Sequence, residues 1–385
     1  MSHTVPWHLG VNDSHCHPTD TMQMVPSISE MKTSKLVIMA TNFSDQQLVV
    51  DVATRFPSKV IPSFGFHPWF SHLIWDDCDP ELRRLAGDQR KHQHYRAVLH
   101  PEPSEGIIVL LPDPSPLSSV LNGLRQRLRD FPQALVGEIG MDRGFRIPDP
   151  EHEAPNDRSQ ESRRLSKYKV KMSHQKLIFK AQLSVAGEMQ RPVSVHGVAC
   201  HGAIFDTFKE LWKGHEIPVE KNKDIKKRRR KIGQNKYEYI SDIADTDSDS
   251  GGDPEYLPGA RTSTHPAVRY PPRICLHSFS APMEQLHQYI HQPAPGLRHP
   301  SELFFSFSTT INTSPDRGHQ NKVSSTIEAV PRECILVESD FHTAGEQQDE
   351  ALGRALLYVA EARHWKVEET VECLNSNWQR FVYGA

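Results

Sequence analysis

Seven side chains that can bind a divalent metal follow short apolar runs in this chain. They are His15, His17, His67, Glu138, His196, His277 and Asp340. Imidazole nitrogens combined with carboxylate oxygens suit ions such as Zn²⁺ and Mn²⁺. A divalent ion lowers the pKa of a bound water molecule and so prepares it for hydrolysis. The residue types therefore indicate a metal-dependent hydrolase, provided that the fold brings them together.

The pair His15-x-His17 is informative only through its context. The chain has 22 histidines in 385 residues, and chance alone gives about one His-x-His pair. A second pair, His92-x-His94, lies in a charged stretch with no strand before it. Residues two apart on a strand point to the same side. His15 and His17, which end an apolar run, can therefore face one metal ion.

The carboxylates also end apolar runs, and each has a structural alternative. Gly137 and Gly140 flank Glu138 and permit close approach of a ligand, but the same Glu would also suit an exposed turn. Asp340 follows a buried strand, where an Asp can instead cap the next helix. Glu338, two residues earlier, is expected to point the same way and to orient a metal ligand.

The strand-end histidines carry a similar ambiguity. His196 and His277 each end a run that contains Val or Ile, and a single strand His is more often a hydrogen-bonded core residue than a ligand. His67 precedes Pro68, which holds the backbone extended where the strand ends. The joint placement of these residues, at successive strand ends in chain order, favours the metal site.

Eight apolar runs with the length of buried strands position these residues. They span residues 9–17, 36–40, 60–67, 134–142, 192–196, 273–277, 303–308 and 334–340. Segments with helical apolar spacing lie at residues 44–56, 117–131, 169–189, 204–212, 283–290, 347–362 and 367–381. Strands that alternate with helices predict βαβ units and a parallel sheet. We expect an α/β fold, a TIM-like (β/α)8 barrel whose strands all end on one face, formed by residues 1–385 as a single domain.

Long polar inserts interrupt this repeat. Residues 76–116 are rich in Pro, His and charge, which predicts an extended loop. Within residues 213–272, the segment 221–231 holds eight basic residues and one acid, and an acidic block follows. Such blocks bury too little apolar surface to offset the entropy of ordering, so we expect this charged insert to be largely disordered. Its basic run 226–231 is either a solvated linker, a nuclear import signal or a DNA-backbone contact.

The composition is typical of a soluble intracellular protein. Lys and Arg total 45 and Asp and Glu total 48, so the near-neutral chain has no global nucleic-acid signature. The six cysteines form no C-x-x-C pair, as in reduced proteins. The N-terminus lacks the pattern of a secretory signal, and no apolar run is long enough to span a bilayer. We expect a cytoplasmic or nuclear location and no membrane association.

Six motifs at the strand ends resemble, in order, the signatures of TatD-type metal-dependent deoxyribonucleases. They are DSHCH at 13–17, GFHP at 65–68, GEIGMD at 137–142, VSVH at 193–196, LHSF at 276–279 and VESD at 337–340. The resemblance covers nearly the whole chain outside the inserts. It implies an amidohydrolase-like barrel, in a divergent branch of fungi or other eukaryotes, with one or two divalent ions (Mg²⁺, Mn²⁺ or Zn²⁺). It assigns His15, His17 and Asp340 to one ion, His196 and His277 to a second, and Glu138 as the bridge.

The resemblance also implies a reaction and a substrate. We hypothesise that the chain hydrolyses phosphodiester bonds of DNA with a metal-activated water molecule. Asp340 would accept the proton of that water, and Glu138 would fix the spacing of the ions. His67 would contact the phosphate or the leaving group.

Three departures from the family pattern bear on substrate recognition more than on metal binding. The family usually has an Arg two positions after the fifth-strand His, where this chain has Val198 after His196. Residues 280–281 are Ser-Ala where the family has Gly, and residues 341–342 are Phe-His where it has a small residue and Pro.

Two alternatives to a deoxyribonuclease therefore stay open. The first is a small-molecule amidohydrolase or lactonase on the same kind of barrel, although those enzymes commonly place a Lys where this chain has Glu138. The second is a barrel with reduced catalysis that acts as a protein-interaction partner, with the inserts as the contact regions.

Overall fold

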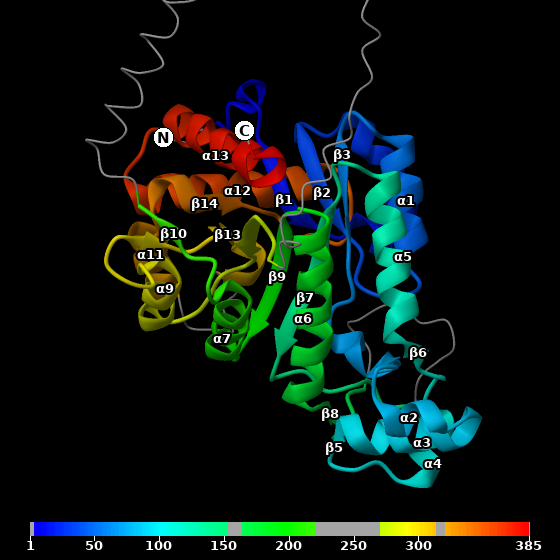
Figure 1. Ribbon diagram of the computed structural model, residues 1–385. Helices are drawn as coiled ribbons and strands as arrows, with labels where there is room; N and C mark the ends of the chain where they lie inside the picture. Colours follow the sequence, from blue (N-terminus) through cyan, green and yellow to red (C-terminus); the bar gives the residue numbers. More distant parts are fainter. Residues whose placement is uncertain (1–3, 152–163, 220–269, 313–319, 385) are drawn as a thin grey trace, which may run out of the picture. The chain divides into compact units, whose positions relative to one another are not determined.

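Eight strands form one parallel sheet that is nearly closed into a barrel (Figure 1). The computed structural model describes residues 4–151, 164–219, 270–312 and 320–384. The strands follow one another around the sheet in chain order: β1 (Asn12–Cys16), β2 (Lys35–Met39), β3 (Val60–Phe64), β7 (Leu135–Asp142), β9 (Val193–Val198), β11 (Arg273–Leu276), β13 (Glu302–Phe307) and β14 (Ile335–Val337). All eight predicted strands are confirmed, and the TIM-like barrel with them.

The barrel closes where the first strand meets the segment after the last one. The backbone N–H of Asp340 donates to the carbonyl of His15 (3.0 Å), and that of His17 donates to the carbonyl of Phe341 (2.8 Å). These bonds lie at the carboxyl ends of β1 and β14. The closure therefore brings the His-x-His motif and Asp340, at opposite ends of the sequence, to one point.

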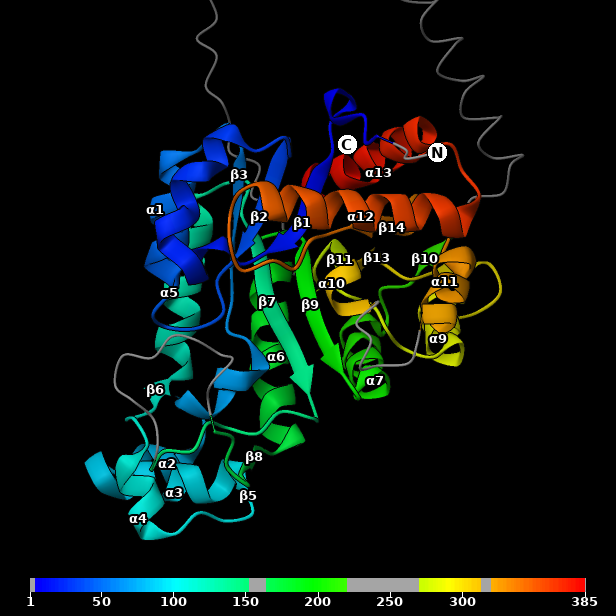
Figure 2. The same cartoon turned by 180° about the vertical axis from the view of Figure 1, so that it is seen from behind.

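Helices surround the barrel and cover its amino-terminal end (Figure 2). Seven of them are α1 (Gln46–Arg55), α5 (Leu117–Asp130), α6 (Met172–Glu188), α7 (His201–Trp212), α9 (Met283–Ile290), α12 (Glu346–Arg363) and α13 (Val367–Tyr383). They match the seven predicted helices to within three residues at each end. The sequence did not predict α10 (Thr309–Asn312), α11 (Gln320–Ala329) or the 3-10 segments η1 (Trp7–Leu9), η2 (Pro18–Glu30), η3 (Pro68–Leu73) and η6 (Arg332–Cys334).

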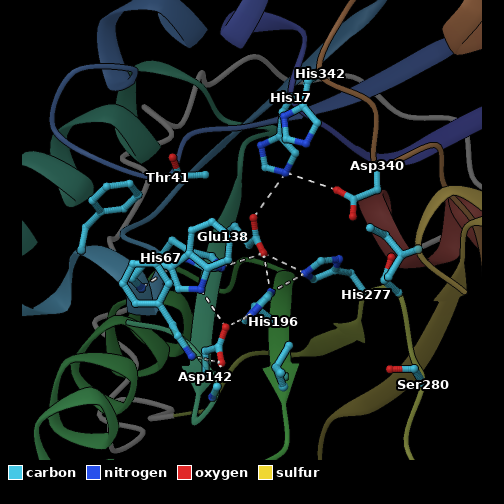
Figure 3. Close-up of a pocket in the computed structure, with 18 of the residues that line it drawn as sticks. His17, Thr41, His67, Glu138, Asp142, His196, His277, Ser280, Asp340 and His342 are labelled. Atoms are coloured by element: carbon cyan, nitrogen blue, oxygen red, sulfur yellow. Dashed lines mark hydrogen bonds and ion pairs between the residues drawn. The ribbon is translucent and has the colours of Figure 1, made fainter. Parts of the chain in front are cut away.

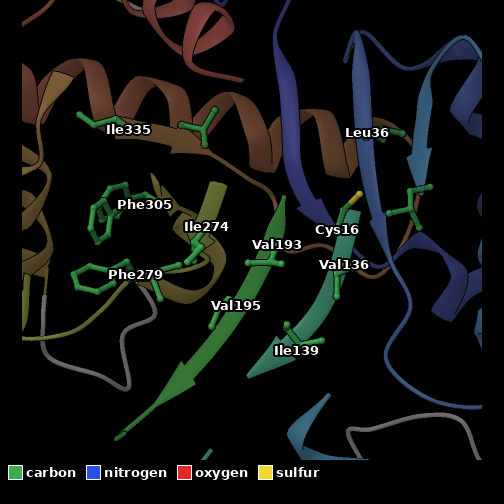
Figure 4. Packing of buried hydrophobic residues seen from close by; sticks show 14 of the residues in the cluster. Cys16, Leu36, Val136, Ile139, Val193, Val195, Ile274, Phe279, Phe305 and Ile335 are labelled. Atoms are coloured by element: carbon green, nitrogen blue, oxygen red, sulfur yellow. The ribbon is translucent and has the colours of Figure 1, made fainter. Parts of the chain in front are cut away.

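Alternate residues of each strand enter two different packing surfaces. On β2, Leu36 and Ile38 pack against the surrounding helices, in the cluster that Figure 4 shows. Val37 and Met39 belong to a second cluster inside the barrel, which Trp378 of α13 covers. Each large apolar side chain buried in this way contributes about 1.5 to 3 kcal/mol. Both strand faces are apolar because both are covered, as in parallel sheets generally.

The predicted extended loop at residues 76–116 is wrong, because this segment is largely helical. It contains α2 (Pro80–Arg84), α3 (Gly87–Val98) and α4 (Glu105–Leu110). It also supplies one strand to each of two short ladders: β6 (Ser115–Pro116) pairs with β4 (Ile74–Trp75), and β5 (Leu99–His100) pairs with β8 (Lys169–Val170). Tyr95 and Ile108 of these helices bury against Ile147 and Tyr168. The apolar partners lie beyond β7 in the sequence, so the local pattern did not show them.

Only a small part of the insert at residues 213–272 is described. The strands β10 (Ile217–Pro218) and β12 (Leu297–Arg298) form an antiparallel pair in a compact unit of their own. The basic run 226–231, the acidic block and the predicted disorder lie outside the described residues.

Within the described part of the chain, no helix is both long and apolar enough to cross a membrane.

Candidate metal centre

All seven predicted side chains meet at the carboxyl ends of the barrel strands, and Figure 3 labels all of them except His15. They come from six of the eight strands. His15 lies on β1 and His17 directly after it, while Glu138 lies on β7 and His196 on β9. The other three follow the ends of their strands: His67 after β3, His277 after β11 and Asp340 after β14. Six of them line a cavity of about 390 Å³, and His15 is fully buried behind it.

Glu138 lies at the centre of the cluster, and its Oε1 atom faces three imidazoles. The distances from this atom are 2.8 Å to His277 Nε2, 3.0 Å to His196 Nδ1 and 3.2 Å to His67 Nε2. His67 therefore lies beside the same carboxylate oxygen as the two histidines assigned to a second ion. Its predicted contact with a phosphate or leaving group stays a prediction.

The other oxygen of Glu138, Oε2, faces the His-x-His motif. It lies 3.4 Å from His17 Nε2 and 3.5 Å from His15 Nε2. Asp340 completes this side, with its Oδ1 atom 3.5 Å from His17 Nε2 and 3.7 Å from His15 Nε2. One carboxylate thus separates two groups of nitrogen and oxygen atoms.

The donor atoms fit one or two divalent cations. The Nε2 atoms of His15 and His17 face each other at 3.0 Å, and His196 Nδ1 faces His277 Nε2 at 3.3 Å. At most one nitrogen of each facing pair can carry the shared proton, so the other nitrogen presents a lone pair towards the centre of the cluster. Imidazole lone pairs and carboxylate oxygens together are the donor set of a transition-metal site. Three triads have donor atoms within 4.8 Å of one another: His15–His17–Glu138, His67–Glu138–His196 and His15–His277–Glu338.

The carboxylates are ionised, as metal ligands must be. Burial raises the pKa of Glu138, but the charges of His67 and His277 lower it more, and the resulting pKa is well below the usual range. Burial also raises the pKa of Asp340, while the hydrogen bond with His17 and nearby imidazole charges bring it far below normal. Burial lowers the pKa of His67 to about 4, so this imidazole is neutral at physiological pH.

The negative charge of the cluster favours positive charge at its centre. Burial lowers the pKa of His17, but the hydrogen bond to Asp340 and the charge of Glu138 raise it to about 9. The pKa of His277 is also well above normal, because Glu138 and Glu338 outweigh the effect of burial. Protons on these imidazoles occupy the position that a metal ion would take, so protons and metal ions compete for the site.

Asp142 orients His196, and the sequence did not predict this role. Its Oδ2 atom lies 3.3 Å from His196 Nε2 and accepts a hydrogen bond from Trp69 Nε1 (2.7 Å). Its Oδ1 atom accepts from the backbone N–H groups of Gly144 and Phe145. Metal-binding histidines commonly contact a carboxylate through the second ring nitrogen. The available signal was the position of Asp142 at the end of a predicted strand.

Two further polar groups hold the histidines. Ser194 Oγ lies 2.8 Å from His15 Nδ1, on the side of the ring away from Glu138. Glu338 Oε1 lies 3.5 Å from His277 Nδ1 and accepts a hydrogen bond from the Ser278 N–H (2.9 Å). The predicted direction of Glu338 is thus the one observed, whereas Ser194 carries no recognisable sequence signal.

The glycines around Glu138 make room for the neighbouring strands. A Cβ atom at Gly140, where φ is +152°, would lie 2.1 Å from the carbonyl oxygen of His196. A Cβ atom at Gly137 would lie 2.8 Å from Ser63 Oγ. The groups that come close to these glycines are the backbone of β9 on one side and a β3 side chain on the other. The expected approach of a ligand stays a prediction.

A parallel barrel that gathers imidazoles and carboxylates at the carboxyl ends of its strands is the architecture of a metal-dependent hydrolase. The chain belongs to the TatD related DNase family, whose model matches residues 12–383.

Two curated relatives span nearly the whole chain. The Cut9-interacting protein scn1 of Schizosaccharomyces pombe is 36% identical over 370 residues, which are 96% of this chain and 98% of the relative. An uncharacterized deoxyribonuclease of Saccharomyces cerevisiae is 25% identical over 392 residues, again 96% and 98% of the two chains.

Solved structures show the same fold at low identity. The TatD homologue YJJV of Escherichia coli has a TM-score of 0.51 at 15% identity, over 97% of this chain and 98% of that one. An uncharacterized amidohydrolase of Saccharomyces cerevisiae has a TM-score of 0.52 at 12% identity, over 95% and 93%. These structural similarities support the barrel fold and do not indicate the substrate.

Proposed function

We propose that this chain is a metal-dependent phosphodiesterase that hydrolyses DNA. The observation that carries the proposal is the position of Glu138, whose two carboxylate oxygens face two separate groups of imidazoles. A shared carboxylate between two cation positions is the arrangement that two-metal hydrolysis of phosphodiesters requires. The family and the printed name of the deoxyribonuclease relative support the choice of DNA.

The side chains have distinct roles in this proposal. Divalent cations, held by His15, His17 and Asp340 on one side and by His196 and His277 on the other, would lower the pKa of a water molecule and neutralise phosphate charge. His67 would contact the phosphate or the leaving group. Asp340 is ionised and would accept the proton of the attacking water when the cations are bound. Glu138 holds the two sides of the site together.

The described lining of the cavity also limits how the substrate binds. Among the residues that the structure describes, no Lys or Arg lines it. The phosphate at the reaction centre would then depend on the cations for charge neutralisation, because no described Lys or Arg lines the cavity. This matches the absence of the family's usual Arg after His196.

Replacement of Glu138 or Asp340 by Ala tests the proposal. We expect each variant to lose at least about a hundredfold in cleavage of a DNA oligonucleotide with added Mg²⁺ or Mn²⁺. Metal analysis of the purified wild type should find bound divalent ions that Glu138→Ala lacks. Asp130→Ala, an exposed carboxylate at the end of α5, is the matched control. Full activity of the Glu138 and Asp340 variants would disprove the assignment.

A second candidate function is protein binding. The relative at 36% identity is named for its interaction with Cut9. This chain would then use its barrel to bind a partner protein. Affinity capture with the wild type and with Glu138→Ala distinguishes the two functions, because a partner that both forms retain does not depend on the metal centre.

A further inference from the structure

A second cavity, of about 340 Å³, lies beside the metal centre. The two cavities share three partly exposed aromatic residues, Trp69, Phe70 and Phe145. The rest of the second cavity is mostly apolar and includes Leu111 and Leu165. Leu111 follows α4, so the 76–116 segment that interrupts the barrel repeat supplies part of this wall.

A pair of stacked aromatic rings forms part of the shared wall, and a hydrogen bond holds one of them. The rings of Trp69 and Phe145 stack with centroids 4.7 Å apart and planes 10° apart. Trp69 Nε1 donates a hydrogen bond to Asp142, which also contacts His196. The position of the aromatic surface relative to the metal centre is therefore set by Asp142, which contacts both.

One buried titratable residue, His72, lines this otherwise mostly apolar cavity. His72 is 5% exposed, and no side chain accepts from or donates to its buried Nδ1 atom. Burial, followed by the charges of His94 and His174, lowers the pKa of His72 to about 3, so the ring is neutral. A neutral imidazole offers one donor and one acceptor nitrogen. A flat apolar wall with a single hydrogen-bonding group is suited to an aromatic heterocycle, which combines a π-face with a polar edge.

The lack of described Lys and Arg side chains in the two cavities favours contacts with the bases of a nucleic acid over contacts with its phosphate backbone. In the described part of the chain, neither cavity is lined by Lys or Arg, whereas binding along a nucleic-acid backbone depends on such side chains. Stacking of bases on aromatic side chains is the other main source of affinity for single strands.

We infer that the second cavity is a subsite for one nucleobase of the substrate, adjacent to the bond that is hydrolysed. The inference rests on the proposed function. The base stacks against the Trp69–Phe145 wall, and its polar edge reaches the His72 nitrogen. The substrate is then a single strand or an unpaired end, because a base in a duplex is not free to enter the cavity.

The first experiment compares a single-stranded oligodeoxynucleotide with the same strand made entirely of abasic sugar units. We expect the wild type to have about a tenfold or greater increase in KM for the abasic strand, from the lost stacking. Leu165→Trp fills the cavity at a residue that is 55% exposed and outside the metal centre. This variant should show a KM for the normal strand near that for the abasic strand. Val109→Trp, at a residue that is 64% exposed and lines neither cavity, should behave as the wild type.

The second experiment needs no metal and no hydrolysis. Crystals of the wild type soaked with deoxyadenosine in the presence of EDTA should show the base against Trp69 and Phe145, and Leu165→Trp crystals should not. Equal KM values for the two strands, a base bound elsewhere, or a cavity filled by the chain itself would overturn the subsite. Failure of the proposed function gives a different result: neither strand is cut, while deoxyadenosine still binds.

Discussion

Asp142 contacts a candidate metal ligand and the wall of the cavity at once. One of its oxygens lies 3.3 Å from His196 Nε2 and accepts the indole N–H of Trp69. The charge of His196, together with hydrogen bonds from His196 and Trp69, lowers the Asp142 pKa to about 2 despite burial. The carboxylate is therefore ionised over the whole range in which the enzyme would work.

Replacement of Asp142 by Ala should weaken metal binding without emptying the site. His196 would lose the partner that fixes its ring, and loss of such a partner typically lowers metal affinity about 10- to 100-fold. Titration of the metal-free protein with Zn²⁺ or Mn²⁺, followed by calorimetry, measures this change. Asp130→Ala, an exposed control, should leave the affinity unchanged. An unaltered affinity in Asp142→Ala would show that His196 needs no orientation or binds no metal.

The sequence predicted which residues meet, but not which of them lie on each side of Glu138. The seven candidates were recognisable because each ends an apolar run, and strand ends of a parallel barrel converge. The distance of His67 from Glu138, 3.2 Å, depends on strand tilt and on the turn at Pro68. Neither has a sequence signal, so the place of His67 among the nitrogens around Glu138 was not predictable.

The contact of β7 with β9 positions Glu138 against His196, and Gly140 permits it. A Cβ atom at Gly140 would lie 2.1 Å from a backbone oxygen, which cannot move aside as a flexible side chain can. Gly140→Ala should cost about 2 to 4 kcal/mol of stability, from backbone strain and overpacking. It should also reduce metal affinity, because the strands separate at the ligands.

Gly106→Ala is the matched control for this substitution. Gly106 lies in α4, and nothing lies within 4 Å of a Cβ atom added there. Alanine is favoured over glycine in a helix, so stability should rise by up to about 1 kcal/mol. Thermal melts of both variants check the pair. Equal melting temperatures would mean that β7 and β9 tolerate a larger separation than the structure indicates.

Three buried histidines join η3, α3 and α6, and they should make stability depend on pH. His72, His94 and His174 are each less than a tenth exposed. Burial lowers their pKa values, to about 3 for His72 and about 4 for His94. The folded pKa lies below the unfolded value of 6.5, so stability is complete above pH 6.5. It falls as the pH drops towards 4, because only the unfolded chain binds the protons.

Replacement of His94 by Gln should remove part of this dependence. The Gln amide can still donate to the His72 carbonyl, which His94 Nε2 contacts at 2.8 Å. Urea unfolding at pH 7 and pH 5 should show the wild type losing about 2 kcal/mol more than the variant over this interval. His287→Gln, an exposed residue of α9, is the control. An identical loss in wild type and His94→Gln would show that His94 is protonated in the folded protein.

The alternation of strands and helices across the chain was sufficient to predict the barrel. Both faces of each strand are covered, which gives continuous apolar runs such as residues 36–39 of β2. The helices of residues 76–116 were missed because their apolar partners, such as Ile147 and Tyr168, come from a distant segment. The individual hydrogen bonds that close the barrel were not predictable either, since they join the two ends of the sequence.

Asp13 is the residue that makes this closure specific. It is fully buried and accepts hydrogen bonds from the N–H and Oγ of Ser339, after β14, and from Gln348 Nε2. It also accepts from the N–H of His15 on its own strand. One carboxylate thus joins the first strand to the last, between the candidate ligands at residues 15 and 340.

Asp13→Ala should therefore affect stability and metal binding together. Loss of the carboxylate leaves several buried donors unpaired, at about 1 to 3 kcal/mol for each, and the free energy of unfolding should fall by at least about 3 kcal/mol. Asp349→Ala is the matched control, since this buried carboxylate accepts from the backbone of Lys32 and Thr33 but touches no candidate ligand. It should lose comparable stability and keep its metal affinity, measured by titration below the unfolding transition. Equal metal affinities in the two variants would show that the ligands are held in place without the hydrogen bonds of Asp13 between β1 and the segment after β14.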